Sequence, residues 1–306
     1  MFIEIREKGK SKKFYLVHSY RDKNKIRRIS QYLGSNLSEK KLLEFRKRAE
    51  QRLLEEIKEQ NILEFELTKE EIEIFKNYEK DFEISHLQTP DWKKFTEDFT
   101  YNTNAIEGST VALPEVKELL NQKEKPKNQD ELETLNVAKA VEYIKMSNEK
   151  MSIVFIKKFH FICFEGTKNF AGKLREVEVI IRDGQGNIVH QGAPAKEVEI
   201  LLNALCRWYE KHNHKYPPLL LAAVIHNEFE KIHPFQDGNG RVGRLLLNYV
   251  LLRHKYRPLN IRFKDRARYY KCLQVYNHKN DVKSTLKFLV NQYRSGVYKI
   301  KSRRLS

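Results

Sequence analysis

Residues 233–244 read HPFQDGNGRVGR, and the apolar triplet LLL follows directly at 245–247. Apolar residues then recur at helical spacing, so Gly238 and Gly240 are predicted to form a turn immediately before a helix. Glycine permits positive φ angles that direct successive backbone N–H groups toward one point, and the positive end of the new helix adds to their field. The stretch therefore predicts an anion site built from backbone amides at the start of a helix.

Four side chains around this turn suit chemistry on a bound polyphosphate. Arg241 and Arg244 stand three residues apart, so they share one face of the helix beside the anion site. Asp237 precedes the turn and offers a hard oxygen ligand for a magnesium ion. His233 is a residue type whose pKa lies near neutrality, which suits a general base. Each residue alone has an ordinary structural explanation, but a turn needs no paired arginines, so the combination favours a catalytic phosphate site.

Two other phosphate motifs match this stretch only in part. A GxGxxG pattern begins at Gly238, but residues 225–232 before it are predicted helix, where the dinucleotide-binding fingerprint requires a strand. The P-loop requires Lys followed by Ser or Thr at its end, whereas Arg244 and Leu245 stand there. Neither motif therefore describes this site.

The stretch resembles the signature of the Fic (fido) family, HxFx[D/E]GNGRxxR, with every fixed position filled. Members of that family typically transfer AMP from ATP to a hydroxyl side chain of a target protein. The resemblance implies that His233 deprotonates this hydroxyl and that Asp237 holds Mg²⁺ or Mn²⁺. It assigns binding of the ATP phosphates to the loop and to the arginines after it, namely Gly238, Asn239, Gly240, Arg241 and Arg244.

The resemblance extends over about residues 60–295. Residues 175–189 alternate in hydrophobicity and read as a hairpin, which the resemblance identifies as a flap to which an extended target segment adds as a strand. A hairpin that only covers the core is the alternative. Four flap residues are grouped with the nucleotide-binding residues by position: Val179, Ile180, Ile181 and Arg182. On a later helix, Tyr269 and Asn277 would line the adenine end of the pocket.

Residues 103–108, TNAIEG, fit the shorter [S/T]xxxE[G/N] inhibitory motif of many Fic proteins. Glu107 could pair bidentately with the guanidinium of Arg244, which would otherwise hold the γ-phosphate. ATP would then bind with its α-phosphate misaligned for attack. Some family members with this glutamate also remove AMP from modified proteins, so Glu107 could instead orient a water molecule.

The chain as a whole has 306 residues, of which 40% are hydrophobic, enough for one substantial core and a small extra module. No apolar run reaches membrane-spanning length and no signal-peptide pattern opens the chain, so we expect a cytoplasmic protein with no membrane partner. The 3 cysteines are isolated and without CxxC spacing, which predicts buried, reduced thiols.

The fold class expected from these patterns is mainly α, a helical fido core with a β-hairpin flap and a small N-terminal hairpin–helix appendage. Helices are predicted at about 38–60, from 68, and at 89–108, 114–121, 129–146, 153–164, 194–211, 217–231, 239–256, 265–277 and 282–294. The N-terminal hairpin is predicted at 13–33. Four regions follow: a basic hairpin and helix at 1–60, a helical region with the inhibitory motif at 61–150, the Fic core at 151–295 and a basic tail at 296–306.

The formal net charge of +17 is carried by the two ends of the chain. Residues 1–60 hold 17 Lys and Arg against 9 Asp and Glu, and residues 253–306 hold 16 against 2, while the middle holds 25 against 30. Such ends could contact nucleic acid or an acidic partner, although solvated basic surface is the more frequent explanation.

We therefore expect a protein adenylyltransferase, autoinhibited by Glu107. A Ser, Thr or Tyr hydroxyl of a target protein, or of the enzyme itself, would attack the α-phosphorus of Mg-ATP and pyrophosphate would leave. The same site could instead remove AMP, and a nucleic-acid-binding protein with a vestigial Fic core is the alternative from another class. Dimers are common in the family, so a homodimer is a further expectation.

Overall fold

The computed structural model describes residues 1–9, 11–22, 25–60, 62, 68–80, 91–121, 125–182, 185–186 and 188–302. The chain divides into two compact units, Met1–Ile62 and Leu63–Ser306. Among the described residues, no helix has the length and apolar character needed to cross a membrane. The predicted helix start at residues 89–90, the flap turn at 183–184 and the end of the tail at 303–306 fall outside the described residues.

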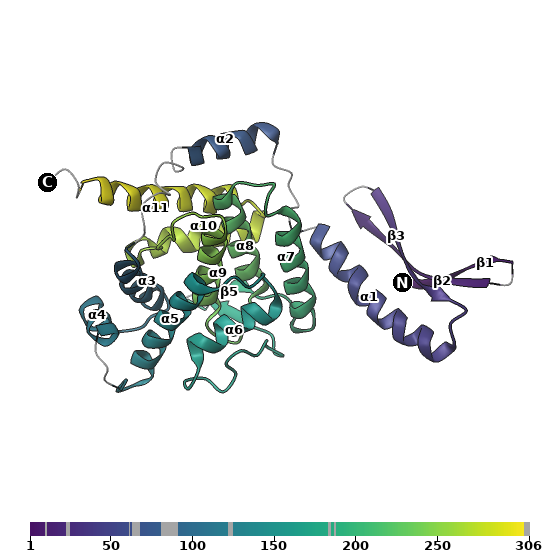
Figure 1. Cartoon of the computed structure of the whole chain (residues 1–306), viewed down its shortest axis with the longest axis horizontal. Helices are drawn as coiled ribbons and strands as arrows, with labels where there is room; N and C mark the ends of the chain where they lie inside the picture. Colours follow the sequence, from purple (N-terminus) through teal and green to yellow (C-terminus); the bar gives the residue numbers. More distant parts are fainter. Residues whose placement is uncertain are drawn as a thin grey trace. The chain divides into compact units, whose positions relative to one another are not determined.

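The N-terminal unit is an antiparallel sheet with one helix against it (Figure 1). Its elements are β1 Phe2–Lys8, β2 Ser11–Asp22, β3 Lys25–Ser35 and α1 Glu39–Gln60, and β2 is the central strand. Leu16 of β2 packs with Ala49 and Leu53 of α1. The predicted two-stranded hairpin was therefore incomplete. The missed strand β1 is rich in charged residues, and its pairing with β2 rather than its own hydrophobicity defines it.

The second unit is built almost entirely of helices, which confirms the mainly α prediction. Their bounds are α2 Lys69–Lys80, α3 Trp92–Ile106, α4 Leu113–Asn121, α5 Gln129–Met146, α6 Ile153–Phe164, α7 Val198–His212, α8 Pro218–Ile232, α9 Asn239–Arg253, α10 Arg266–Lys279 and α11 Lys283–Ser302. Short 3₁₀ turns lie at Ala195–Glu197 and Phe263–Asp265. Helices α8 and α9 lie at the centre of the unit and are buried along most of their length (Figure 1).

Side-chain caps fix where several of these helices begin. The Asp91 carboxylate accepts from the backbone N–H of Lys94 at 2.9 Å, and Ser152 accepts from the N–H of Phe155 at 3.1 Å. Pro194 leads into a 3₁₀ turn, so α7 begins at Val198 and the prediction of a helix from residue 194 was wrong.

Two other predicted helix ends were also wrong. Helix α9 ends at Arg253 rather than 256, because Lys255 adopts a left-handed conformation with φ 62°. Helix α11 continues beyond residue 294 to Ser302, so the first part of the predicted tail is helical.

The flap is shorter than predicted and shifted along the chain. Strands β4 Ile180–Arg182 and β5 Ile188–Gln191 pair antiparallel, with Ile181 opposite His190. Residues 175–179, predicted to belong to the first strand, precede it instead. The reason is Arg175, which is only 5% exposed and is directed into the protein, so the alternating pattern does not begin until after it.

Candidate phosphate-binding and catalytic site

The signature turn joins the two central helices, α8 and α9. His233 ends α8 in the left-handed region with φ 53° and ψ 62°, and Gly238, with φ 82°, precedes the first residue of α9. The side-chain amide of Asn239 closes the turn, because it accepts from the N–H of Phe235 and donates to the carbonyl of Phe235, both at 2.8 Å. These two bonds hold the turn in place. The first N–H groups of α9 follow it and have no carbonyl of a preceding helical turn to bond, so they can bind an anion.

His160, which was not predicted as a site residue, packs against this turn. The ring of His160 on α6 stacks on Phe235 with centroids 3.9 Å apart. The N–H of Gly172 donates to Nδ1 of His160 at 2.8 Å, so Nε2 carries the ring proton and donates to the carbonyl of Asp237 at 3.0 Å. Burial lowers the pKa of His160 to about 4, which keeps the ring neutral. Its sequence signal was weak, because two lysines also interrupt the apolar residues of this helix.

The three glycines of the stretch are required by space, and Gly238 is required by its positive φ as well. A Cβ at Gly238 would lie 2.1 Å from the ring of Phe164. At Gly240 it would lie 2.2 Å from Oε1 of Glu107, and at Gly243 it would lie 2.3 Å from Oε1 of Glu230. The start of α9 therefore sits directly against two carboxylates that come from other helices.

His233 is held in its strained conformation by Arg175. The Arg175 guanidinium donates to the backbone carbonyls of His233 at 2.6 Å, of Val177 at 2.7 Å and of Ile232 at 3.2 Å, and also to the carbonyl of Ala193. One buried arginine thus ties the end of α8 to both sides of the flap. From the sequence, Arg175 was predicted only to belong to a strand, because bonds to four backbone acceptors leave no trace in a sequence pattern.

The His233 imidazole is largely buried, and its Nδ1 has no hydrogen-bond partner among the described residues. Burial, followed by the nearby His190, lowers the pKa of His233 to about 4, so the neutral base form predominates near pH 7. The His190 and His233 rings lie 5.4 Å apart. Asn277 donates from Nδ2 to Nδ1 of His190 at 3.0 Å. The side chain predicted to line the adenine end therefore holds a flap histidine beside the candidate base.

Arg244 is the most confined cation of the site, with a side chain only 2% exposed. Its Nε donates to Oγ1 of Thr103 at 2.7 Å, and its Nη2 donates to the carbonyl of Thr103 at 3.0 Å and to Oε1 of Glu107 at 2.6 Å. Burial opposes ionisation of this guanidinium, but Glu107, Tyr269 and Glu230 together outweigh burial and raise the pKa of Arg244 above its usual value.

The pairing of Glu107 with Arg244 is a single hydrogen bond, so the bidentate pair predicted from the sequence was wrong. The edge formed by Nε and Nη2 is already occupied by Thr103, which leaves one Nη2 hydrogen for Glu107. Thr103 and Glu107 stand one helical turn apart at the end of α3, where Glu107 is the C-cap residue. This spacing explains why the threonine and the glutamate of the motif act on one arginine.

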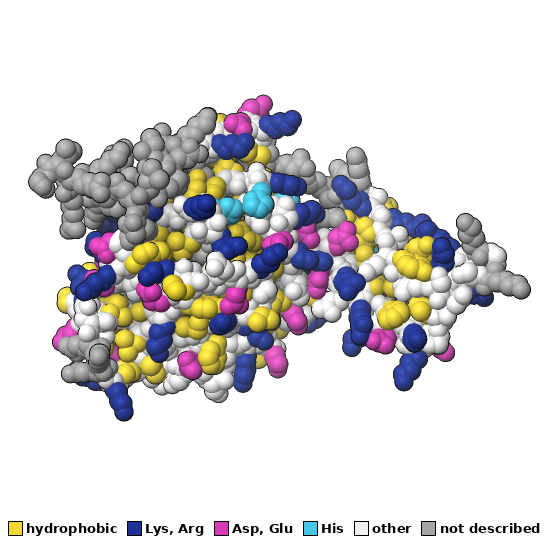
Figure 2. All heavy atoms as spheres, in the orientation of Figure 1, with side chains coloured by type: hydrophobic (Ala, Val, Ile, Leu, Met, Phe, Trp, Pro, Cys, Tyr) yellow, Lys and Arg dark blue, Asp and Glu magenta, His cyan; other side chains and the backbone are white. Residues whose placement is uncertain are grey.

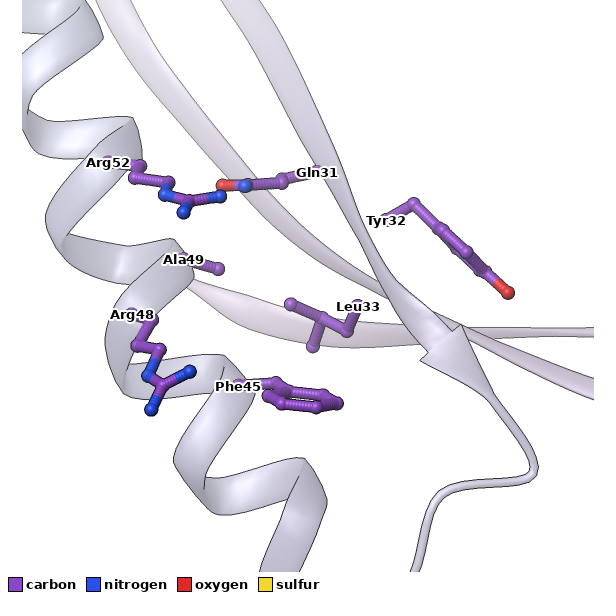
Figure 3. A pocket seen from close by; sticks show the side chains of 7 residues that line it. All are labelled: Gln31, Tyr32, Leu33, Phe45, Arg48, Ala49 and Arg52. Carbon is purple, nitrogen blue, oxygen red and sulfur yellow. The ribbon is translucent and has the colours of Figure 1, made fainter.

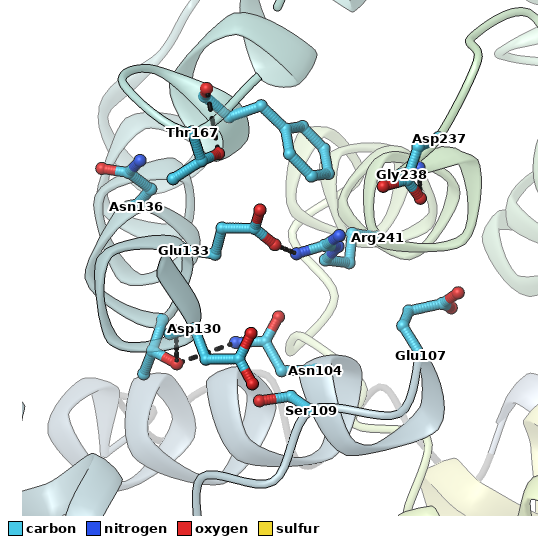
Figure 4. A network of polar contacts seen from close by, with 12 residues as sticks. Asn104, Glu107, Ser109, Asp130, Glu133, Asn136, Thr167, Asp237, Gly238 and Arg241 are labelled. Atoms are coloured by element: carbon cyan, nitrogen blue, oxygen red, sulfur yellow. Dashed lines mark hydrogen bonds and ion pairs between the residues drawn. The ribbon is translucent and has the colours of Figure 1, made fainter. Parts of the chain in front are cut away.

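Arg241 and Asp237 have partners of their own in a second polar network (Figure 4). Nη1 of Arg241 donates to Oε2 of Glu133 on α5 at 2.5 Å, and its guanidinium lies 4.2 Å from the centre of the Phe164 ring. Nζ of Lys168 lies 3.4 Å from Oδ2 of Asp237 and 4.0 Å from Oε1 of Glu133. Glu133 and Lys168 were not predicted as site residues, because they are far from the signature in the chain.

Tyr269 lies behind Arg244 rather than at the surface of a pocket. It is 1% exposed, and its hydroxyl lies 2.8 Å from Nε2 of His226 and 3.4 Å from Nη1 of Arg244. Tyr269 thus supports the arginine from inside the protein, and its contact with the adenine stays a prediction. Next to it, burial raises the pKa of Glu230 to about 8, and its Oε1 has no partner in the described structure.

The flap presents its apolar side chains to solvent. Val177, Ile180, Ile181 and Ile188 are between 38% and 53% exposed. The carbonyl of Val179 accepts from the N–H of Gly192 at 3.0 Å, and Arg182 donates from Nη1 to the carbonyl of Gly186 at 2.8 Å. A short two-stranded ribbon with an exposed apolar surface is suited to accept another extended chain.

Asp237 is the acidic side chain of the signature turn that could hold a metal ion. The described residues contain no group of three or more His, Cys, Asp and Glu placed to hold a metal ion by themselves. Asp237 is exposed at the mouth of the turn, and its Oδ1 accepts from the N–H of Gly238 at 2.6 Å. This donor set fits a magnesium ion that takes its remaining ligands from phosphate oxygens and water.

Comparisons with known proteins find similarity over part of the chain. Residues 150–251 match the model of the Fic/DOC family. The chain is 31% identical over 198 residues to "Protein adenylyltransferase Fic" of Nematostella vectensis, which covers 62% of this chain and 45% of that protein. It thus spans less than half the length of the curated relatives that it matches.

Two solved structures share the fold at low sequence identity. A Fic domain-containing signaling protein from Bacteroides thetaiotaomicron matches with a TM-score of 0.65 and 24% identity, over 72% of this chain and 92% of that one. A Fic family protein from Desulfovibrio desulfuricans matches with a TM-score of 0.67 and 24% identity, over 79% and 77%. The fold class predicted from the sequence is therefore confirmed.

Proposed function

Because residues 150–251 carry a Fic/DOC family domain, we propose that this protein is a protein adenylyltransferase that is restrained by its own Glu107. The observation that carries the proposal is the convergence at one turn of a neutral buried base, His233, an exposed carboxylate, Asp237, and the amides that open α9. The curated relatives named protein adenylyltransferase support the reaction class.

In the proposed reaction, His233 accepts the proton of a Ser, Thr or Tyr hydroxyl on a target protein, or on this protein itself. The hydroxyl oxygen forms a bond to the α-phosphorus of ATP. The bond from that phosphorus to the oxygen bridging the α- and β-phosphates breaks, and pyrophosphate leaves. Arg175 contributes by holding His233 in place, and burial contributes by keeping its imidazole neutral before the proton is transferred.

The phosphates of ATP would bind at the start of α9. The amides of Gly238, Asn239 and Gly240 lie at the positive end of the helix, and Arg241 and Arg244 follow on its first turns. Asp237 would hold Mg²⁺ or Mn²⁺, which when bound would neutralise charge on the phosphates. Lys168, beside Asp237, supplies a further positive charge at this end of the site.

The restraint follows from the partner of Arg244. Glu107 occupies one N–H of this arginine and lies against Gly240, where the loop would approach the phosphates. ATP whose γ-phosphate cannot reach Arg244 would be bound with its α-phosphorus out of line with the attacking hydroxyl. The same carboxylate could orient a water molecule, so removal of AMP from a modified protein is the second candidate reaction. The Glu107 side chain is 30% exposed, which gives water access to its carboxylate.

Two further roles belong to this proposal. The flap residues Val179, Ile180, Ile181 and Arg182 would dock an extended segment of the target, supported by the exposed apolar side chains of this ribbon. Asn277 and the region around it would contact the adenine.

A cytoplasmic location, a homodimer and the division into regions 61–150, 151–295 and 296–306 also stay proposals. Size-exclusion chromatography tests the homodimer.

The proposal is tested by incubating the purified protein with Mg-ATP and a lysate. Mass spectrometry is then applied to this protein and to the lysate proteins. Covalent addition of an AMP group to a Ser, Thr or Tyr, absent with His233→Ala, is the expected result. Addition of a bare phosphoryl group, or the same products from His233→Ala, would contradict it.

A further inference from the structure

The strands of the N-terminal unit carry a concentration of positive charge that the phosphate site does not use. Residues 1–38 hold 10 Lys and Arg against 3 Asp and Glu, whereas residues 39–62 hold 7 against 6. The sheet thus has a formal charge of +7, while the helix that packs on it is nearly neutral. In Figure 2, Lys and Arg side chains lie beside exposed hydrophobic ones on this unit.

The two faces of the sheet have different surroundings. One face packs on α1 through Leu16, and Ile29 and Leu33 lie in the same cluster. Successive side chains of a strand point to opposite faces, so Tyr15, next to Leu16, belongs to the face away from α1. Cross-strand pairing places these residues on the same face: Phe2, Glu4, Arg6, Lys13, Tyr15, Arg28 and Tyr32, which we call the outer face.

The outer face combines aromatic rings with arginines. The rings of Tyr15 and Tyr32 lie 5.3 Å apart, and the Arg6 guanidinium lies 4.3 Å from the centre of the Tyr15 ring. The Arg28 guanidinium lies 6.0 Å from the centre of the Phe2 ring. Phe2 and Tyr32 are 52% and 51% exposed, which is unusual for two large rings on one small sheet.

One carboxylate organises the two arginines. Glu4 accepts from Nε of Arg6 at 2.7 Å and also from Nη2 of Arg28. These arginines, first of all through the hydrogen bond from Arg6, lower the pKa of Glu4, so it is ionised near pH 7. The Glu4 carboxylate therefore occupies a position at which an external anion could contact both guanidinium groups.

The basic surface continues past the edge of β3. A cavity of about 220 Å³ lies between β3 and α1, and Arg48 and Arg52 of the helix line it together with Phe45 (Figure 3). The Oε1 atom of Gln31, also in its wall, is buried and has no hydrogen-bond partner among the described residues. The edge of the sheet thus offers a polar recess beside the outer face.

We propose that the outer face binds single-stranded nucleic acid. Arg6 and Arg28 would contact phosphates in place of Glu4, and Phe2 and Tyr32 would stack on bases. A single strand presents evenly spaced negative charges together with free aromatic faces, which matches a surface of arginines and exposed rings. A duplex hides its base faces, and an acidic protein segment has none. This binding is independent of adenylyl transfer, because the outer face belongs to the unit Met1–Ile62 and the family match lies at residues 150–251.

The test is fluorescence anisotropy of the full-length protein with a labelled oligothymidylate of about 12 nucleotides, in salt between about 50 and 200 mM. Replacing both Arg6 and Arg28 by Ala should weaken binding at least about tenfold and reduce the salt slope by about 1.4, because two phosphate contacts are lost. Tyr32→Ala should weaken binding at least about fivefold without changing the salt slope, since stacking releases no counterions. Glu4→Gln should tighten binding, because it removes the competing anion.

A matched control removes the same charge from the other unit. The double variant Lys93→Ala with Lys117→Ala, at two exposed lysines, should leave affinity within about twofold of wild type. Circular dichroism and AMP incorporation should be unchanged in every variant, which separates this proposal from the enzymatic one. Equal affinity of wild type and the outer-face variants would overturn it. So would tighter binding of a duplex of the same length, or equal competition by polyglutamate.

Discussion

Oε1 of Glu107 accepts a 2.6 Å hydrogen bond from Nη2 of Arg244. The Glu107 side chain, at the end of α3, is 30% exposed, whereas the Arg244 side chain is 2% exposed. The arginine cannot turn away from the site, because Thr103 holds its Nε and Nη2 and Tyr269 lies behind it. The glutamate is free of such constraint. Any rearrangement that exposes Arg244 to a phosphate must therefore come from Glu107 and the end of α3, not from the signature helix.

The first prediction concerns the proton accepted by His233. His233→Ala should abolish AMP transfer while Mg-ATP still binds, because only the group that takes the proton is removed. With its pKa lowered to about 4 by burial, the wild-type base form is populated from weakly acidic pH upward. The acid limb of kcat/KM should therefore fall near pH 4 to 5 rather than near 6.5, the value of an unperturbed imidazole.

His190→Asn provides the control for that assignment. His190 is the second cause of the lowered pKa of His233, so its loss should move the acid limb to higher pH while the protein stays folded. An acid limb that stays at the same pH in His190→Asn, or that lies near 6.5 in wild type, would mean that another group titrates in the rate.

The second prediction concerns Asp237. Asp237→Asn keeps the size of the side chain but removes the charge of the only signature carboxylate, so the Mg²⁺ concentration for half-maximal activity should rise at least about tenfold. Calorimetric titration of ATP with and without Mg²⁺ gives a readout apart from turnover: the metal should no longer strengthen ATP binding. Glu133→Gln, which alters the partner of Arg241, is the matched control, and an equal metal response in both variants would reassign the ligand.

The third prediction uses the buried acid behind Arg244. Burial raises the pKa of Glu230 to about 8, above its unfolded value near 4.5. The folded state therefore binds the proton more tightly than the unfolded state, so this group's contribution to stability is present below about pH 4.5 and is lost as pH rises toward 8. Glu230→Gln mimics the protonated acid and should be more stable than wild type by about 1–3 kcal/mol at pH 8.

Urea unfolding at two pH values measures this difference. The advantage of Glu230→Gln should be largest at pH 8 and should become small near pH 4.5, where wild-type Glu230 is protonated in the folded state and half protonated in the unfolded state. A constant difference at both pH values would show that the amide acts through packing and not through ionisation.

Much of the fold and of the site could be predicted because the relevant signals are local. Helix α5 begins and ends at the predicted residues 129 and 146, since its cap Asn128 and its apolar spacing lie within one segment. The signature turn likewise contains its own glycines, its base and its arginines in twelve consecutive residues. The single bond between Glu107 and Arg244 could not be predicted as such, because it depends on Thr103 having taken the other edge of the guanidinium.

The features that were missed depend on contacts between distant segments. Arg175 reaches four carbonyls from three different parts of the chain, and Glu133 meets Arg241 across 108 positions of sequence. Strand β1 pairs with β2 along its whole length, whereas its own signal is limited to three apolar residues among four charged ones. Such pairings appear only when the chain is folded.

The most direct measurement is incorporation of α-labelled AMP at saturating Mg-ATP by four proteins: wild type, Glu107→Gly, Arg244→Ala and the double variant. Glu107→Gly should incorporate at least about ten times more AMP than wild type, equivalent to about 1.4 kcal/mol of improved alignment. In the Arg244→Ala background the same change should have no effect, because the arginine through which Glu107 acts is gone. Equal incorporation by wild type and Glu107→Gly would contradict the restraint and favour a water-orienting role for Glu107.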